Sequence, residues 1–258
     1  MYRIALFLRS LLFTLWMLVV TVLFAPTCFI SAPFPYRTRY WWTSRWTLII
    51  LWGARHFCGI HHQVKGMENL PPPGEQAILL SKHQSAWETI FYVLGFRGHP
   101  LTYVFKKELL YVPFFGWGIG LLRMIPIDRS KGKDAFAQVV EVGRQRLAQG
   151  IWIIMFPEGT RTKVGSQGKY KMGGTRLAVE TGTQVVPVAV NSGDCWPKNS
   201  FIKKPGTITV SIGKPIPSVG REPAELMQEV ENWIESEMRV LSPHAYATTD
   251  RVAKQAQH

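Results

Sequence analysis

The sequence predicts an α/β protein, with a mostly parallel β-sheet flanked by helices and preceded by an N-terminal membrane-embedded helical segment. Strand-like apolar runs alternate with helix-like segments between residues 76 and 241, a pattern typical of parallel α/β domains. The first 60 residues are instead dominated by apolar and aromatic side chains. We therefore divide the 258 residues into a membrane-anchoring part at 1–60, a globular domain at 61–241 and a polar tail at 242–258.

The membrane-anchoring part contains two apolar runs. No charged residue occurs within 10–36, and residues 11–25 are the most apolar. A helix of about 15 residues covers about 23 Å, so spanning the roughly 30 Å hydrocarbon core requires continuation through Pro26, which interrupts the run, toward Ala32. The second run, at 46–52, is shorter. Together they predict either one transmembrane helix with an interfacial segment or a hairpin embedded in one leaflet.

Charge and aromatic content favour an anionic membrane surface as a partner. The chain has 30 Lys and Arg against 17 Asp and Glu, a formal net charge of +13. No tight basic block or nucleic-acid-binding signature is present, so nucleic acid is not an expected partner. Aromatic and basic residues are mixed, as is typical of the headgroup level, at Arg37, Arg39, Tyr40, Trp41, Trp42, Arg45 and Trp46.

A cleaved signal peptide is the competing interpretation of the N-terminus, because Arg3 and Arg9 precede an apolar core. Two observations count against it. A second apolar run follows the first, and the three cysteines are odd in number and form no close pair, which fits a reducing compartment. Basic residues lie on both sides of the first run, so charge does not orient it.

The globular domain shows a regular series of elements. Dense apolar or alternating side chains predict strands at 76–80, 150–156, 184–190 and 207–212. Helical spacing predicts helices at 87–94, 133–149, 173–180 and 223–241. The Gly- and Lys-rich stretch 165–174 is expected to be a mobile loop. The last helix has an apolar side made of Leu226, Val230, Trp233, Ile234 and Met238.

His83 and Glu88 form the first candidate constellation. A neutral imidazole accepts a proton from a hydroxyl when its other nitrogen is held protonated, which a nearby carboxylate can do. Within a helix, a five-residue separation places two side chains about 140° apart. We therefore expect His83 in the turn after the strand 76–80, with Glu88 reaching back from the first turn of the next helix. A chance pairing remains the alternative, and Ser85 as a nucleophile lacks an orienting motif.

The run Pro157-Glu-Gly-Thr-Arg161 is the second constellation, and it follows the strand 150–156 directly. Ligands of open α/β sheets collect at the carboxyl ends of strands. Free backbone N–H groups, a hydroxyl and a guanidinium suit a phosphate group. The alternative is a solvated turn with a surface ion pair between Glu158 and Arg161.

These motifs resemble the glycerolphosphate and 1-acyl-glycerol-3-phosphate acyltransferases of phospholipid synthesis, which carry four ordered blocks. The resemblance covers about residues 60 to 215, and one departure is that most members have Asp where this chain has Glu88. The carboxylate is retained and gains a methylene, so the orientation of His83 should survive. The counterparts are Lys82-His-Gln-Ser-Ala-Trp-Glu88, then Phe105 to Gly116 followed by Ile127-Asp-Arg129, then Phe156 to Arg161, and Val185 to Val190.

The resemblance implies a glycerolphosphate acyltransferase-like fold, with 61–241 as the catalytic domain. It also implies acyl transfer from acyl-CoA or an acyl carrier protein to the free hydroxyl of lysophosphatidic acid, giving phosphatidic acid, at the cytoplasmic side of the cell's inner membrane. His83 would act as general base and Glu88 would orient it. The phosphate of the acceptor would be held by residues of the second and third blocks, namely Lys106 or Lys107, Arg129, Glu158, Gly159, Thr160 and Arg161.

Other functions remain open. Glu88 in place of Asp leaves another lysophospholipid, or a glycolipid or lipid A precursor, as a possible acceptor, and an inactive lipid-binding protein on the same scaffold is the alternative outside catalysis. We expect no metal and no cofactor. His61 and His62 have no Cys or Glu at a ligand spacing nearby, and the glycines in 116–120 do not match a dinucleotide-binding pattern.

Overall fold

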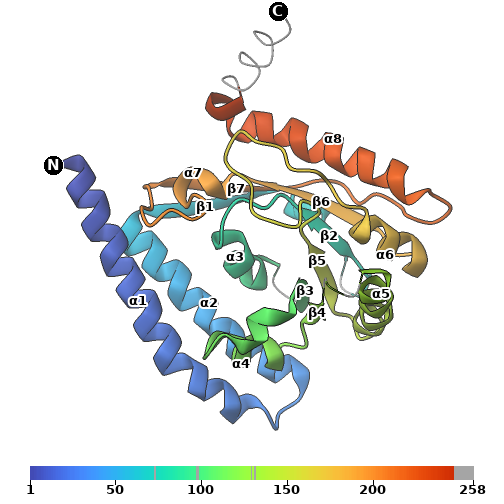
Figure 1. The fold of residues 1–258 in the computed structure, drawn as a ribbon, viewed down its shortest axis with the longest axis horizontal. Coiled ribbons are helices and arrows are strands. Elements are labelled where there is room, and N and C mark those ends of the chain that lie inside the picture. Colours follow the sequence, from blue (N-terminus) through green and yellow to red (C-terminus); the bar gives the residue numbers. More distant parts are fainter. Residues whose placement is uncertain (73, 97–98, 129, 131, 247–258) are drawn as a thin grey trace, which may run out of the picture.

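A seven-stranded β-sheet forms the centre of the protein (Figure 1). The computed structural model describes residues 1–72, 74–96, 99–128, 130 and 132–246. The strand order is β1-β7-β6-β2-β5-β3-β4. The strands are β1 Ile60–Lys65, β2 Ile78–Ser81, β3 Leu101–Lys106, β4 Ile125–Ile127, β5 Trp152–Met155, β6 Val185–Val190 and β7 Gly206–Ile212.

Ten helical segments connect or flank these strands in the described part of the chain. The short 3-10 helices are η1 Met67–Asn69 and η2 Lys107–Tyr111. The α-helices are α1 Tyr2–Ser31, α2 Tyr36–Cys58, α3 Trp87–Gly95, α4 Phe115–Leu121, α5 Gly132–Ala148, α6 Gly173–Thr181, α7 Ser192–Cys195 and α8 Pro223–Leu241.

The sheet is mostly parallel, which confirms the predicted fold class. Of the strand pairs within the described ranges, β6 and β7 alone run antiparallel. The neighbouring strands β6, β2, β5 and β3 share one direction, so their carboxyl ends meet at the same edge of the sheet. Residues that follow β6, β2 and β5 can therefore contribute to one site.

Apolar layers cover both faces of the sheet, because successive side chains of a strand point to opposite faces. Leu79 packs with residues of α2 and α3, whereas Ile78 and Leu80 pack with residues of α5, α6 and α8. Figure 1 shows α3 on the first face and α8 on the other. The predicted apolar side of α8 is confirmed, with Trp233 half-buried at its margin and four residues fully buried in the second layer, Leu226, Val230, Ile234 and Met238.

The two N-terminal helices pack against each other along their lengths (Figure 1). Helix α1 continues through Pro26 to Ser31, and its 30 residues extend about 45 Å. Buried Ala25 and Cys28 flank Pro26, so tertiary packing outweighs the hydrogen bond that the proline removes. Among the described residues, α1 is the one helix long and apolar enough to cross a membrane, by length and composition.

Helix α2 is longer than the apolar run 46–52 on which a short interfacial segment was predicted. Its polar and aromatic first turns are part of the same helix. Near its other end, Gly53 lets α1 approach α2 closely. The Trp16 indole lies where a side chain at Gly53 would stand, with Cδ1 2.4 Å from the position of a Cβ atom there. Trp16 also donates to the Ile49 carbonyl at 3.2 Å.

The first residues of the predicted tail pack on the domain. Ser242 is fully buried and donates to Asp194 Oδ2 at 2.7 Å, and Tyr246 is buried in the second apolar layer. A buried serine and a buried tyrosine therefore anchor residues 242–246, the first part of the predicted polar tail, to the domain. Residues 247–258 lie outside the described residues.

Candidate active site

His83 and Glu88 lie together where the sequence predicted. β2 ends at Ser81 and α3 begins at Trp87, so His83 stands in the connecting turn and Glu88 in the first helical turn. His83 Nδ1 and Glu88 Oε1 are 2.8 Å apart. The Glu88 side chain is fully buried, whereas 14% of the His83 side chain is exposed. An ionised carboxylate accepts only, so in the neutral imidazole Nδ1 carries the proton of this bond and Nε2 has the free lone pair.

The helix terminus itself holds the carboxylate in place. Glu88 Oε1 also accepts from the backbone N–H groups of Gln84 at 2.9 Å and Ser85 at 2.7 Å. In return, Ser85 Oγ accepts from the backbone N–H of Trp87 at 3.0 Å. The pattern is close to a capping box and has its sequence signature Ser-x-x-Glu at 85–88, but the N-cap residue of α3 is Ala86 and Ser85 Oγ bonds Trp87. That signature was available in the sequence and explains why Ser85 serves the helix terminus.

One face of the His83 ring is covered by Phe156. The two ring centroids are 3.9 Å apart and the ring planes differ by 16°. With Nδ1 bound to Glu88 and one face stacked on Phe156, the ring has a single orientation. His83 lines a cavity, and Nε2 is the ring nitrogen left for a ligand there.

The cavity beside His83 is large and mostly apolar, with a volume of about 1210 Å³. It lies between the N-terminal helices and the ends of the central strands, and side chains of α1, α2, α3 and α4 line it. Pockets for drug-sized ligands measure about 300–1,000 Å³, so this cavity suits a larger molecule. Its polar lining includes Lys106, Thr160, Arg161 and Lys171 close to the carboxyl ends of β3 and β5.

The remaining residues predicted for the phosphate are distributed differently. Gly159 lines the cavity and has a φ of 68°, a left-handed conformation that favours glycine. Lys107 is exposed at the start of η2 and is not among the residues lining the cavity. Arg129 lies outside the described residues.

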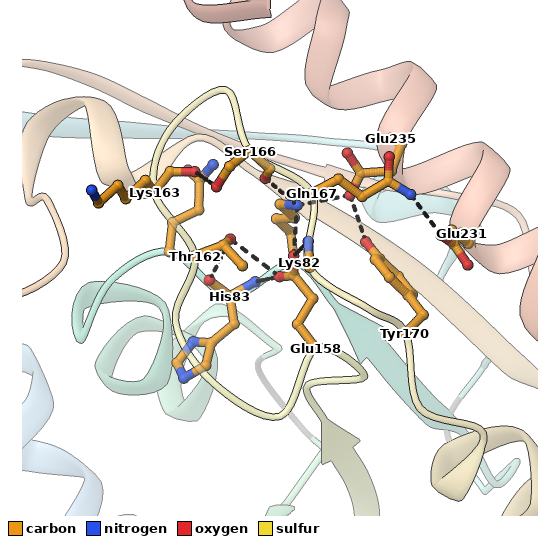
Figure 2. A network of polar contacts seen from close by, with 12 residues as sticks. Lys82, His83, Glu158, Thr162, Lys163, Ser166, Gln167, Tyr170, Glu231 and Glu235 are labelled. Carbon is orange, nitrogen blue, oxygen red and sulfur yellow. Dashed lines mark hydrogen bonds and ion pairs between the residues drawn. The ribbon is translucent and has the colours of Figure 1, made fainter. Parts of the chain in front are cut away.

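Glu158 is buried and forms an ion pair with Lys82 at 2.8 Å, in place of the surface pair with Arg161 considered as an alternative (Figure 2). Its Oε2 accepts from the backbone N–H of His83 at 3.1 Å, and its Oε1 accepts from that of Gly168 at 3.0 Å. Thr162 completes the link, because its backbone N–H donates to the His83 carbonyl at 2.7 Å. Glu158 thus binds the turn that carries His83 to the loop that carries Arg161.

Lys82 is the centre of a buried ionic network that the sequence did not reveal (Figure 2). Its Nζ has three acceptors, one for each proton: Glu158 Oε1 at 2.8 Å, Glu235 Oε1 at 2.7 Å and the Ser166 carbonyl at 3.1 Å. Glu235 lies on α8, 153 residues after Lys82. No local pattern connects such distant positions, so only the tertiary structure identifies the pair.

Tyr170 donates its hydroxyl proton to Glu235 Oε1 at 2.9 Å. Burial, followed by the charges of Glu235 and Glu158, raises the pKa of Tyr170, so this hydroxyl remains a donor throughout the physiological range. The network joins β2, the loop after β5, and α8 into one rigid support beneath His83.

Comparison with known proteins points to one family. The family model described as Acyltransferase matches residues 61–191. Over 240 residues the chain is 44% identical to the 1-acyl-sn-glycerol-3-phosphate acyltransferase of Pseudomonas aeruginosa, covering 91% of this chain and 92% of that protein. It is 29% identical over 212 residues to the 1-acyl-sn-glycerol-3-phosphate acyltransferase alpha of Ovis aries, covering 82% of this chain and 71% of that protein.

The fold is shared with a solved structure. The crystal structure of the 1-acyl-sn-glycerophosphate (LPA) acyltransferase PlsC from Thermotoga maritima superimposes with a TM-score of 0.77, covering 94% of this chain and 98% of that chain. The sequence identity is 23%, so this comparison supports the fold alone.

Proposed function

Because this chain belongs to the acyltransferase family, together with 1-acyl-sn-glycerol-3-phosphate acyltransferases, we propose that it acylates lysophosphatidic acid to phosphatidic acid. The observation that carries this proposal is the His83–Glu88 pair at an apolar cavity that also contains Arg161 and Lys106. A site that acylates a lysolipid needs a base, a cation that binds phosphate and space for a hydrocarbon chain.

In the proposed reaction, His83 Nε2 removes the proton of the acceptor's free hydroxyl. At the same time the hydroxyl oxygen attacks the carbonyl carbon of the thioester. The carbonyl π electrons move to oxygen, and their return expels the thiolate. The imidazolium then gives its proton to that leaving group, which restores His83 and releases a free thiol. Glu88 holds the Nδ1 proton and stabilises the positive imidazolium between these steps. The thioester is already activated, so no covalent enzyme intermediate is needed.

The acceptor phosphate is assigned to the cationic side of the cavity. Arg161 is half-buried in the loop after β5, and Lys106 is the last residue of β3. A guanidinium presents two parallel N–H donors to phosphate oxygens, and lysine adds a second positive charge. Binding the phosphate here places the glycerol hydroxyl toward His83, which lines the same cavity.

The hydrocarbon chains of both substrates are assigned to the apolar part of the cavity. Its walls include Leu18 and Val22 of α1 and Ile90 of α3, which offer no hydrogen-bonding partner to a headgroup. A site placed between the N-terminal helices and the sheet allows a lipid to enter from a membrane without exposing its tail to water. The donor is an acyl-CoA or acyl carrier protein thioester, which places the catalytic domain on the cytoplasmic side of the inner membrane.

The test is an acyl-transfer assay with the full chain in membranes, offering several lysophospholipids and both classes of donor. We expect lysophosphatidic acid to be acylated faster than the other lysophospholipids, and His83→Ala to lower kcat by roughly 10²–10⁴-fold, the range of general-base catalysis. His61→Ala is the matched control, because His61 is exposed on β1. A wild-type rate in His83→Ala would refute the proposed base, and preference for another acceptor would refute the assigned substrate.

A further inference from the structure

Ser192 makes a direct contact with the carboxylate that orients His83. Its hydroxyl donates to Glu88 Oε2 at 2.6 Å, and both residues are fully buried. The other carboxylate oxygen, Oε1, accepts from His83 Nδ1 and from two backbone N–H groups. The two oxygens therefore have separate tasks, and Ser192 is the partner that the structure gives to Oε2.

The segment after β6 is built to approach the turn of His83. Gly193 donates its backbone N–H to Gln84 Oε1 at 3.2 Å. A Cβ atom at Gly193 would stand 3.1 Å from Gln84 Cβ and 2.7 Å from Val164 Cγ2. Any larger residue at position 193 would push this segment away, so the glycine allows Ser192 to reach Glu88.

Asn191 anchors the same segment from the opposite side. Its Oδ1 accepts from the backbone N–H of Thr209 on β7 at 2.7 Å, and its Nδ2 donates to Asp194 Oδ2 at 3.2 Å and to the Leu241 carbonyl at 3.3 Å. Ser192 is therefore fixed between an anchored asparagine and a closely packed glycine. The neighbours hold the backbone of Ser192, and its hydroxyl is held by the bond to Glu88.

We propose that Ser192 is a positioning residue for the His83–Glu88 pair, an inference that rests on the proposed function. A buried carboxylate is stable in its charged form only when its oxygens have donors. By holding Oε2, Ser192 fixes the plane of the carboxylate and keeps an Oε1 lone pair directed at His83 Nδ1. Glu88 is one methylene longer than Asp, and this length lets the carboxylate bridge the end of β2 and the end of β6.

Kinetics of Ser192→Ala test this role in the full chain in membranes. Ser192→Ala removes a hydrogen bond to the charged carboxylate that aligns His83. We therefore expect kcat to fall roughly 10- to 100-fold. We expect KM for lysophosphatidic acid to change less than about twofold, because Ser192 does not line the cavity. Ser192→Cys, a weaker donor of similar size, should retain an intermediate kcat. An unchanged kcat in Ser192→Ala would overturn the proposal.

The matched control is Ser218→Ala. Ser218 is equally buried and donates to the Ala178 carbonyl at 2.9 Å, remote from the His83 turn. Its replacement removes one buried serine hydrogen bond, here to a neutral carbonyl, without touching Glu88. We expect Ser218→Ala to lower the melting temperature and to leave kcat unchanged. Equal losses of kcat in Ser192→Ala and Ser218→Ala would show a general packing effect and overturn the positioning role.

A double-mutant cycle with Glu88→Asp separates positioning from packing. The shorter carboxylate is drawn back from Ser192, so Ser192→Ala should change kcat less than about twofold in that background. The full effect of Ser192→Ala in both backgrounds would mean that the hydroxyl does not act through Glu88, and the proposal would fail.

A readout independent of activity distinguishes failure of this inference from failure of the proposed function. In protein labelled with ¹⁵N-histidine, the His83 Nδ1 resonance is assigned by its loss in His83→Ala. We expect Ser192→Ala to shift this resonance and Ser218→Ala to leave it in place. An unshifted resonance in Ser192→Ala overturns the inference. A shifted resonance in a protein that does not acylate lysophosphatidic acid supports the inference and refutes the proposed substrate.

Discussion

Glu88 illustrates how much one side chain does at the scale of single residues. The oxygen that accepts the His83 Nδ1 proton also accepts from two backbone N–H groups of the turn before α3, and the second oxygen accepts from Ser192. The pairing with His83 could be predicted, because strand, turn and helix are contiguous in the sequence. The contact with Ser192 joins positions 104 residues apart and follows no local pattern.

Glu88→Gln is expected to be far more damaging than Glu88→Asp. An amide replaces one accepting oxygen with an NH₂ group, which opposes one of the four donors now directed at Glu88, whereas aspartate keeps the charge. We expect Glu88→Gln to lower kcat by roughly 10³- to 10⁴-fold, as loss of an orienting carboxylate does elsewhere. The measurement is kcat with membranes containing equal amounts of each variant. Equal activity in the two variants would make Glu88 a purely structural residue.

Arg161→Ala should weaken binding of the acceptor rather than slow the chemical step. Its guanidinium lines the cavity and is half-buried, so its charge is poorly screened by water. We expect KM for lysophosphatidic acid to rise about tenfold or more, with a smaller change in kcat. Lys163→Ala is the control, since Lys163 is exposed in the same loop and is not among the residues lining the cavity. An unchanged KM would remove Arg161 from the phosphate site.

At the scale of elements, most of the predicted strands and helices were found, often within two residues of their predicted ends. Three strands, β1, β3 and β4, were not predicted. The sequence of β1, Ile-His-His-Gln-Val-Lys, lacks an apolar pattern because it is an edge strand, largely exposed and paired with β7 alone. Pro26 was expected to interrupt α1, yet packing on both sides keeps that helix continuous. Local sequence propensity predicted helices and strands well, except where tertiary contacts determine whether a segment is helical or extended.

The link between β2 and α8 should dominate stability. Lys82→Met leaves Glu158 and Glu235 as two buried carboxylates without a cation, and we expect a loss of about 3–5 kcal/mol in the free energy of unfolding. Arg221→Met is the control, because the Arg221–Glu229 pair is partly exposed to solvent and surface pairs contribute about 1 kcal/mol or less. Denaturant unfolding in detergent measures both. Similar losses in the two variants would contradict a stabilising role for the network.

Packing of α1 on α2 should depend on Gly53. A Cβ atom there meets the Trp16 ring, so Gly53→Ala is expected to cost about 1–3 kcal/mol through displacement of that ring. Gly120 of α4 provides the comparison, because a Cβ atom added there has no neighbour within 4 Å. The melting temperature in detergent should fall for Gly53→Ala only. A fall of the same size for Gly120→Ala would show that the helical glycines act through their flexibility instead.

For the whole molecule, the two N-terminal helices give the site a wall and the protein an apolar outer surface. Large apolar side chains of α1 remain exposed, at Leu8, Leu12, Leu15, Leu18, Val19 and Leu23 among others. The sequence predicted a membrane-embedded segment from composition, but it could not show that this segment lines the cavity beside His83. That relation arises only when residues near position 20 and residues near position 90 meet in the fold.

Membrane retention should therefore depend on that outer surface. Leu12→Asp combined with Val19→Asp places two charges on it, each costing about 2.5–3.5 kcal/mol at the centre of a membrane-spanning helix. We expect the double variant to remain in the supernatant when vesicles are sedimented, whereas the wild-type protein sediments with them. Val240→Asp is the control, because Val240 is an exposed apolar residue of α8 on the globular domain. Full retention of the double variant would exclude this face of α1 from membrane binding.

The network at Lys82 also bears on the order in which the protein assembles during synthesis. Glu235 is made 153 residues after Lys82, and Ser192 is made 104 residues after Glu88. The apolar N-terminal helices therefore leave the ribosome long before the groups that align His83 exist. We therefore expect the nascent chain to reach the bilayer before its site is assembled, and acyl transfer to begin only after α8 has packed on the sheet.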